Sequence, residues 1–321
     1  MSTPQNVSGI YGNVTVTGPA TGGAKIATLT GSLTVVGTLT VQNGGTLLTD
    51  CRPLVGAGNF VLAAGGTLGI CDAVGIEATG NVGSVQLTGT RSFSNDASYI
   101  HNGIVAQVTG GALPGQVRNL STTNANTVTL NGPKTVTQVL AVQGTGNLVL
   151  NGMALTLPSN AGGTALVVNS STGIVQGNTA LMQRYINPSQ NAGAGYRHFS
   201  APVTNTTIAD LTTASFTPTL NTDYNSSATP GQVKPFPTVY GYDQSRVAST
   251  TNSLSPFDKG WYSPTATTDP MTVGRGYTVN LDAAQKADFA GTLTTGTQAV
   301  ALARTSGATT ADGGWALMGN P

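Results

Sequence analysis

Side chains able to do chemistry are scarce in this 321-residue chain, which has two cysteines and two histidines. His101 and His198 are too few for a histidine-rich metal site, and a Ser-His-acid triad could use only one of them. His198 lies two residues from Ser200, so an extended strand would place both on one face, without a nucleophile elbow or oxyanion hole. A structural role is favoured for each histidine over a catalytic one.

Carboxylates are equally sparse in the first 177 residues. They are Asp50, Asp72, Glu77 and Asp96. Polysaccharide lyases and hydrolases built on β-helices need paired carboxylates or an acidic calcium cluster. Asp50 and Asp72, which flank the two cysteines, are the one candidate pair, and turn capping is the favoured role. We expect a protein that is not an enzyme, with a carbohydrate-active enzyme as an alternative.

Four aspartates of the later sequence could take part in a calcium site. They are Asp223, Asp243, Asp258 and Asp269. All fall in predicted loops, but the D-x-D-x-D-G spacing of a calcium loop is absent. We therefore expect no cofactor, with calcium as the one ion to consider.

Aromatic residues of the same region could stack on the apolar faces of sugars. The candidates are Tyr240, Tyr242, Trp261 and Tyr262. Alternation along a strand places Tyr240 and Tyr242 on one face and points Trp261 and Tyr262 in opposite directions. The alternative is that these rings belong to the hydrophobic core.

Both cysteines follow a repeated phrase. GTLTVQNGGTLLTDC ends at Cys51 and GNFVLAAGGTLGIC ends at Cys71, with the GGTL motifs 21 residues apart and the cysteines 20 apart. A period of about 20 residues is typical of a solenoid, in which each repeat stacks on its neighbour. Rungs about 4.8 Å apart would place the two Cα atoms within the roughly 4.4 to 6.8 Å that a disulfide needs. We expect a Cys51–Cys71 disulfide at one corner, with a one-residue difference in the turn between Leu47 and Cys51. Two buried free thiols are the alternative.

The fold expected for residues 1–177 is a right-handed parallel β-helix. Short runs alternate apolar residues with Thr, Asn or Gln and are separated by Gly or Asn, as half-buried strands joined by tight turns are. Examples are 13–17, 32–36, 38–41, 59–62, 84–88, 127–130, 147–150 and 165–168. A pair of antiparallel sandwiches is the alternative.

A second domain is expected over residues 178–321. Both tryptophans lie there, together with eight of the 13 basic residues and eight of the 12 acidic residues. Longer aromatic strands joined by Pro, Gly and Asn loops indicate an antiparallel β-sandwich-like domain, with a short helix near residues 208–214.

Composition argues against two classes of partner. Charged residues make up 8% of the chain, the net charge is +1, and Lys and Arg are scattered. Nucleic-acid binding needs clustered phosphate contacts, and a spanning helix needs about 18 consecutive apolar residues. We expect neither nucleic-acid binding nor membrane insertion.

Several phrases resemble large cell-surface and secreted repeat proteins of Bacteroidetes. In the first domain they are Ala97–Gly103, Gln107–Gly110, Leu113–Pro114, Val117–Leu120 and Val128–Leu130. In the second they are Arg184–Ile186, Tyr196–Val203, Gly274–Tyr277 and Gly314–Pro321. The resemblance implies adhesin-like substrates of type IX secretion, located outside the cell or on its surface.

The ends of the sequence suggest a fragment of a longer parent. The start lacks the charged and apolar regions of a secretory signal, and the end falls inside a strand-and-turn phrase. We expect a second domain truncated at its C-terminus, with the sorting domain further along in the parent.

The function expected from these features is structural or adhesive: a rigid solenoid stalk or surface module that contacts surface glycans or other cell-surface proteins. A self-assembling filament is the alternative, because the end of a β-helix is an unpaired strand edge.

Overall fold

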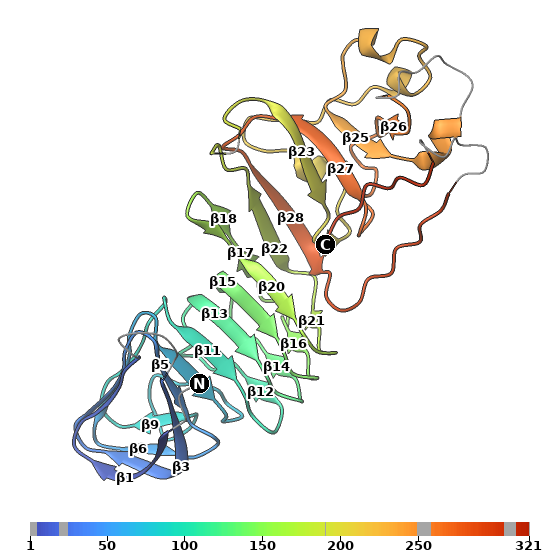
Figure 1. The fold of residues 1–321 in the computed structure, drawn as a ribbon. Coiled ribbons are helices and arrows are strands. Elements are labelled where there is room, and N and C mark those ends of the chain that lie inside the picture. Colours follow the sequence, from blue (N-terminus) through green and yellow to red (C-terminus); the bar gives the residue numbers. More distant parts are fainter. Residues whose placement is uncertain (1–4, 19–24, 190, 249–257, 305–312, 321) are drawn as a thin grey trace. The chain divides into compact units, whose positions relative to one another are not determined.

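The chain forms two compact units in a computed structural model that describes residues 5–18, 25–189, 191–248, 258–304 and 313–320. The first unit is Met1–Pro158 with Gly163–Thr179, and the second is Ser159–Gly162 with Ala180–Pro321 (Figure 1). The expected boundary at residue 177 lies two residues from the main division. Pro321, the last residue of the closing phrase, lies outside the described residues. None of the helices in the described part is both long enough and apolar enough for a membrane span.

The first unit is a parallel β-solenoid (Figure 1), with about eight turns in the part of the chain that the structure describes. Its largest sheet contains β1 (Gln5–Tyr11), β3 (Lys25–Val35), β5 (Gly45–Leu48), β6 (Leu54–Gly56), β8 (Thr67–Ile70), β9 (Val85–Leu87), β11 (Ser98–His101), β13 (Gln116–Thr122), β15 (Lys134–Val142), β17 (Leu155–Leu157) and β20 (Leu166–Asn169). β19 (Gly163–Thr164) is a further short strand of this unit.

Two smaller sheets form other sides of the turns. One contains β2 (Val14–Val16), β4 (Thr38–Val41), β7 (Asn59–Leu62) and β10 (Arg91–Phe93). The other contains β12 (Gln107–Val108), β14 (Val128–Thr129), β16 (Leu148–Val149) and β21 (Val175–Gln176). Strands in both sheets pair in parallel, so the alternative of two antiparallel sandwiches is wrong for this half.

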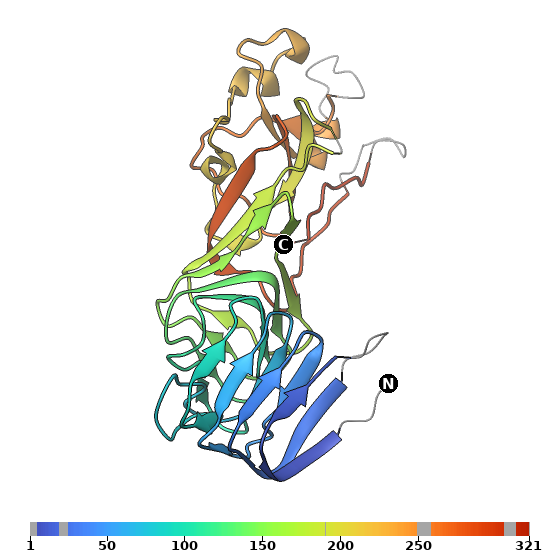
Figure 2. The same cartoon turned by 90° about the vertical axis from the view of Figure 1, so that its left-hand side faces the viewer.

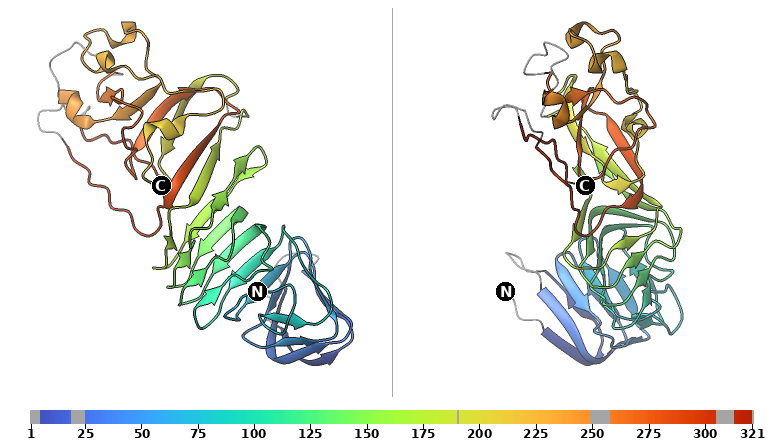
Figure 3. Two further views of the ribbon diagram at one scale, coloured as in Figure 1. Left: turned by 180° about the vertical axis from the view of Figure 1, so that it is seen from behind. Right: turned by 90° about the vertical axis from the view of Figure 1, so that its right-hand side faces the viewer.

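The core of the solenoid is a set of apolar columns. One column runs in register through Leu47, Leu68, Tyr99, Leu120 and Leu140, and every member has at most 1% of its surface exposed. Full burial of one such leucine contributes roughly 1.5 to 3 kcal/mol. The column explains the alternation in the sequence, because only every second residue of each strand points inward. Figure 3 shows the parallel strands that carry these residues from behind.

The turns differ in length although the strands stay in register. The spacing between column members is 21 residues from Leu47 to Leu68 and 20 from Leu120 to Leu140, but 31 from Leu68 to Tyr99. The longer turn contains residues 72–83, which form bends and turns outside the strands. The expected period of about 20 residues therefore holds for turns without an insertion.

Glycine and asparagine build the corners. A Cβ on Gly58 would lie 2.3 Å from the carbonyl oxygen of Gly37 in the preceding turn, and one on Gly89 would lie 2.6 Å from that of Gly58. Neighbouring asparagines bind the next turn: Asn13 Oδ1 accepts from the Thr38 amide at 2.8 Å, and Asn59 Oδ1 accepts from the Thr90 amide at 2.8 Å. Close stacking thus requires glycine, and the asparagine bonds link successive turns.

A histidine and a lysine are buried inside the solenoid. His101 is fully buried and its ring nitrogens have no partner with hydrogen-bond geometry. Burial lowers the pKa of His101 to about 4, and this outweighs the opposing effect of the Thr109 backbone. Lys134, 6% exposed, donates from Nζ to the Leu113 carbonyl at 3.0 Å, and burial lowers its pKa. His101 is therefore a neutral core residue near neutral pH.

The second unit is antiparallel. One sheet has the order β24-β28-β22, from β22 (Ala180–Tyr185), β24 (Val203–Thr204) and β28 (Lys286–Leu293). The other has the order β23-β27-β25-β26, from β23 (Gly195–Ser200), β25 (Val239–Tyr242), β26 (Trp261–Tyr262) and β27 (Gly276–Leu281). Phe199 of β23 contacts Phe289 of β28 with ring centroids 6.3 Å apart, in a core shared by both sheets.

Short elements complete this unit. They are β18 (Ser159–Asn160) and the 3-10 helices η1 (Ile208–Leu211), η2 (Thr222–Asn225), η3 (Pro230–Gln232) and η4 (Gln244–Ala248). The helix expected near residues 208–214 corresponds to η1. Its Thr207 and Asp210 form a capping box, in which Asp210 Oδ2 accepts from the Thr207 amide at 2.7 Å.

Candidate functional site

The four-stranded sheet of the second unit has one core face and one aromatic face. Tyr277 and Val279 of β27 are buried on the core face. Thr278, between them, points the other way and lies in register with His198 on β23 and Tyr240 on β25. Period-2 alternation thus aligns three potential ligand contacts across three strands.

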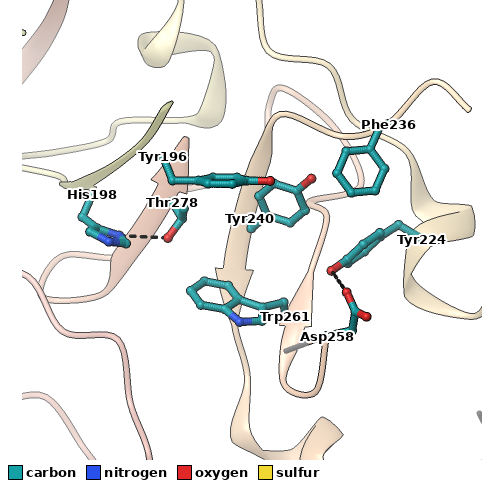
Figure 4. Close-up of a pocket in the computed structure, with 8 residues that line it drawn as sticks. All are labelled: Tyr196, His198, Tyr224, Phe236, Tyr240, Asp258, Trp261 and Thr278. Carbon is teal, nitrogen blue, oxygen red and sulfur yellow. Dashed lines mark hydrogen bonds between the residues drawn. The ribbon is translucent and has the colours of Figure 1, made fainter. Parts of the chain in front are cut away.

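Five aromatic side chains gather above this face. They are Tyr196, Tyr224, Phe236, Tyr240 and Trp261, and they line a pocket of about 170 Å³ (Figure 4). Tyr240 lies near the centre, with its ring centroid 5.4 Å from that of Tyr224, 6.1 Å from Tyr196 and 6.3 Å from Phe236. In Figure 4, Tyr196 and Trp261 lie on opposite sides of the open space.

Exposure differs sharply among these rings. Tyr224 and Tyr240 are 5% exposed, whereas Tyr196 is 49% exposed and Phe236 37% exposed. The buried pair therefore forms a fixed wall, and the exposed pair forms a rim that solvent reaches.

Among the residues that the structure describes, three polar ones also line the pocket: Asp258, His198 and Thr278. The Tyr224 hydroxyl donates to Asp258 Oδ1 at 3.3 Å, and His198 Nδ1 lies 2.9 Å from Thr278 Oγ1. No lysine or arginine is among the lining residues that the structure describes. The pocket is mainly aromatic, with one carboxylate in its wall.

The two buried tyrosines are hydrogen-bond donors at neutral pH. Burial raises the pKa of Tyr224 well above its usual value, and Asp258 adds to the effect. Burial also raises the pKa of Tyr240, whose hydroxyl donates to the Pro237 carbonyl. Both phenols stay protonated, so the rings can serve as neutral stacking surfaces.

The structure separates the four predicted glycan-contact residues. Tyr240 and Trp261 line the pocket. Tyr242 contacts Trp261 with ring centroids 5.3 Å apart, but it does not line the pocket. Tyr262 lies on the opposite face, where a Cβ on Gly241 would be 2.4 Å from its ring. Tyr240, Tyr242 and Trp261 therefore lie on one face of the sheet and Tyr262 on the other, as strand alternation predicts.

Sequence reasoning missed three of the five rings. Tyr196 alternates with His198 on β23, so a period-2 reading of that strand could have found it. Tyr224 and Phe236 come from η2 and the loop after η3. No local pattern relates them to the strands, and only the tertiary fold brings them together.

The predicted calcium ligands have separate surroundings. Asp243 Oδ1 accepts from the Ser245 amide at 2.9 Å, and Asp269 Oδ2 accepts from the Thr265 amide at 2.7 Å. Asp223 is exposed in η2, while Asp258 lies in the pocket wall. Within the described ranges, no three His, Cys, Asp or Glu residues form a metal-binding group. Calcium binding stays a prediction.

Asp269 shows what such a carboxylate does in its loop. Burial alone would raise its pKa, but hydrogen bonds from the amide and hydroxyl of Thr265 and from the Ala266 amide hold the pKa below the usual value. The carboxylate closes the turn between residues 265 and 269, as a structural cap does.

The two cysteines are joined across neighbouring solenoid turns. Cys51 and Cys71 form a disulfide with Cα atoms 4.8 Å apart. Paired residues of the two turns are 21 positions apart up to the pair Leu48 and Gly69. The first copy then has one extra residue, accommodated by positive φ angles at Asp50 (46°) and Cys51 (55°) and closed by a bond from the Arg52 amide to the Thr49 carbonyl.

The candidate carboxylate pair of the solenoid does not share one hollow. A hollow of about 200 Å³ beside the disulfide is lined by Asp72 and Arg52, while Asp50 is outside its lining. Asp72 Oδ1 accepts from the Val74 amide at 2.9 Å, which is a turn-capping bond.

Comparison of the chain with protein-family models, curated proteins and solved structures finds no match. The resemblance to Bacteroidetes surface proteins therefore stays a prediction.

Proposed function

We propose that the chain is a non-catalytic structural and adhesive module of an extracellular or cell-surface protein, and that the aromatic pocket of its second unit contacts glycans. The solenoid would supply a rigid stalk or scaffold. Parallel turns with buried apolar columns and few charges fit a structural role.

The aromatic pocket is the observation that carries this proposal. Sugars present flat apolar C–H faces together with hydroxyl groups. The rings of Tyr196 and Trp261, which lie on opposite sides of the open space, suit the apolar faces, and the polar atoms of His198, Thr278 and Asp258 suit the hydroxyl groups. Since the rim is already exposed, a ligand could enter without a large rearrangement.

A glycan array probed with the full chain tests this proposal. Trp261→Leu removes a ring from the pocket, and Tyr262→Leu removes the adjacent ring from the opposite face. We expect glycan binding by the parent chain, a loss of about tenfold or more for Trp261→Leu, and near-parental binding for Tyr262→Leu. Equal losses in both variants, or no binding by the parent chain, would contradict the proposal.

Self-assembly is a second candidate, favoured by the outermost strand of the solenoid. β1, dark blue in Figure 2, pairs with β3, and its residues Gln5–Tyr11 include no charged side chain. Ile10 is 77% exposed and Tyr11 is 43% exposed. Natural edge strands usually resist pairing through charges or proline, so this edge is suited to add a strand from another copy.

Light scattering at rising concentration distinguishes this candidate. Ile10→Lys places a charge on the edge, and Ile104→Lys places one on an equally exposed residue (79%) outside the strands. Self-assembly predicts mass growth that Ile10→Lys abolishes and Ile104→Lys preserves. Constant monomer mass for the parent chain would exclude assembly through β1 under the conditions measured.

A further inference from the structure

The composition of the pocket wall narrows the chemistry of its ligand. Five rings surround a space of about 170 Å³, and the acidic residue in the lining is Asp258. Pockets for drug-sized ligands are roughly 300 to 1,000 Å³, so this one suits a single ring or group. We propose that the pocket selects the protonated amino group of an amino sugar over neutral and acidic sugars. This inference rests on the proposed glycan-binding function.

The aromatic rings favour a cation at the centre of the space. Ring faces carry negative charge density, and a cation within about 6 Å of a ring centroid gains roughly 0.5 to 2 kcal/mol. Tyr196, Tyr240 and Trp261 border the open space on three sides (Figure 4). An ammonium group placed there would lie beside several aromatic rings at once and would be attracted to the negative charge density of their faces, whereas a neutral hydroxyl carries no charge for that attraction.

Asp258 adds a formal negative charge on the same wall. Its Oδ1 lies 3.3 Å from the Tyr224 hydroxyl, which fixes the carboxylate beside the rings. A hydrogen bond between an ammonium group and a carboxylate is about twice as strong as one between neutral groups. An acidic sugar would instead bring like charge toward Asp258.

The positive charge of the nearby Arg246 does not offset the preference for an ammonium group, because Arg246 does not line the pocket. Arg246 donates to the carbonyls of Asn225 at 2.6 Å and Trp261 at 3.3 Å, and it is not a lining residue. Its charge is therefore directed at backbone carbonyls, while Asp258 and the ring faces border the ligand space.

Titration calorimetry of the full chain with four monosaccharides tests the inference. The probes are glucosamine, N-acetylglucosamine, glucose and glucuronate, at equal pH and ionic strength. We expect glucosamine to bind about tenfold or more tightly than the neutral sugars, and glucuronate to bind most weakly. A tenfold difference corresponds to about 1.4 kcal/mol.

Matched variants separate charge from stacking. Asp258→Asn should weaken glucosamine binding about tenfold and should weaken glucose binding much less, because asparagine keeps one oxygen acceptor for a sugar hydroxyl but loses the charge. Asp288→Asn, which removes one charge from an exposed position of β28, should change neither. Tyr196→Leu should lose more glucosamine affinity than Tyr196→Phe, because phenylalanine retains a ring face. Thermal unfolding of each variant checks that the fold is retained.

The outcomes distinguish the two proposals. Equal affinity for glucose and glucosamine that Trp261→Leu weakens would overturn the amino-sugar preference and leave glycan binding standing. Unchanged glucosamine binding in Asp258→Asn would also overturn the preference. If none of the four sugars bound, the amino-sugar preference would also be overturned. The glycan array would then test the proposed glycan-binding function independently.

Discussion

The two units obtain order from opposite sources. In the solenoid, each turn repeats the previous one. Its buried apolar side chains stack on those of the next turn, and its corner glycines let the backbones of neighbouring turns approach closely. In the second unit, strands run antiparallel, and aromatic rings from strands, loops and a 3-10 helix converge on one sheet face. In the solenoid, the inward side chains stack on those of the neighbouring turns, whereas the second unit leaves the rings of Tyr196 and Phe236 partly exposed to solvent.

The largest expected difference between the units is their response to acid. The folded-state pKa of His101 is about 4, below its ordinary value of 6.5. The unfolded chain therefore binds a proton first as the pH falls. The stabilising contribution is complete above about pH 6.5 and is lost toward pH 4, a change of between about 3 and 4 kcal/mol.

Chemical unfolding between pH 7 and pH 4 measures this loss. Both tryptophans lie in the second unit, so their fluorescence follows that unit, while far-UV circular dichroism reports both. His101→Leu should flatten the acid dependence of the solenoid transition. His198→Gln, at an exposed position, should leave it unchanged. An unaltered acid dependence in His101→Leu would contradict this account.

Removal of the disulfide should come next in size. Cys51 and Cys71 are 20 residues apart, and closing a loop of that length stabilises a protein by about 3 kcal/mol. Cys51→Ser with Cys71→Ser should lower the unfolding temperature of the solenoid and spare the tryptophan transition. A reductant should lower the unfolding temperature of the solenoid in the parent chain by the same amount. It should not change the unfolding temperature of the double variant.

A methyl group at a solenoid corner should have a smaller effect. Gly58→Ala forces its Cβ against the Gly37 carbonyl, and overpacking of this kind costs about 2 kcal/mol. Gly115→Ala is the control, because a Cβ there has no atom within 4 Å. Urea unfolding compares the two, and equal stability would show that the turns can shift apart freely.

The smallest effect is expected for a turn cap in the second unit. Asp269→Asn weakens the bonds from Thr265 and Ala266 and should cost about 1 kcal/mol, because hydrogen bonds to a charged group are stronger than those to a neutral amide. The lowered pKa of Asp269 means that its contribution is present above the ordinary pKa and is lost as the pH falls. Tryptophan fluorescence during urea unfolding should detect the change.

Repetition made the solenoid predictable from the sequence. The GGTL phrases gave the register of Leu47 and Leu68, and alternation gave the strands around Leu39 and Phe60. The insertion of residues 72–83 was not predicted, because a long corner leaves the strand register intact and has no periodic pattern.

The candidate site was only partly predictable. Tyr240 and Trp261 were identified because they lie on strands whose alternation can be read directly. Tyr224 and Phe236 come from non-repeating segments, and their positions depend on long-range packing against Tyr240. Asp258 was identified for calcium, and its place beside the rings could not be inferred from spacing.

The disulfide also fixes how the solenoid would yield to mechanical force. Tension on the ends of the chain would peel turns apart, but the segment between Cys51 and Cys71 cannot extend while the bond is intact. This conceals about 65 Å of contour length, since extended chain spans roughly 3.3 to 3.6 Å per residue. At full extension, the chain with the disulfide intact is therefore shorter than the reduced chain by about that length.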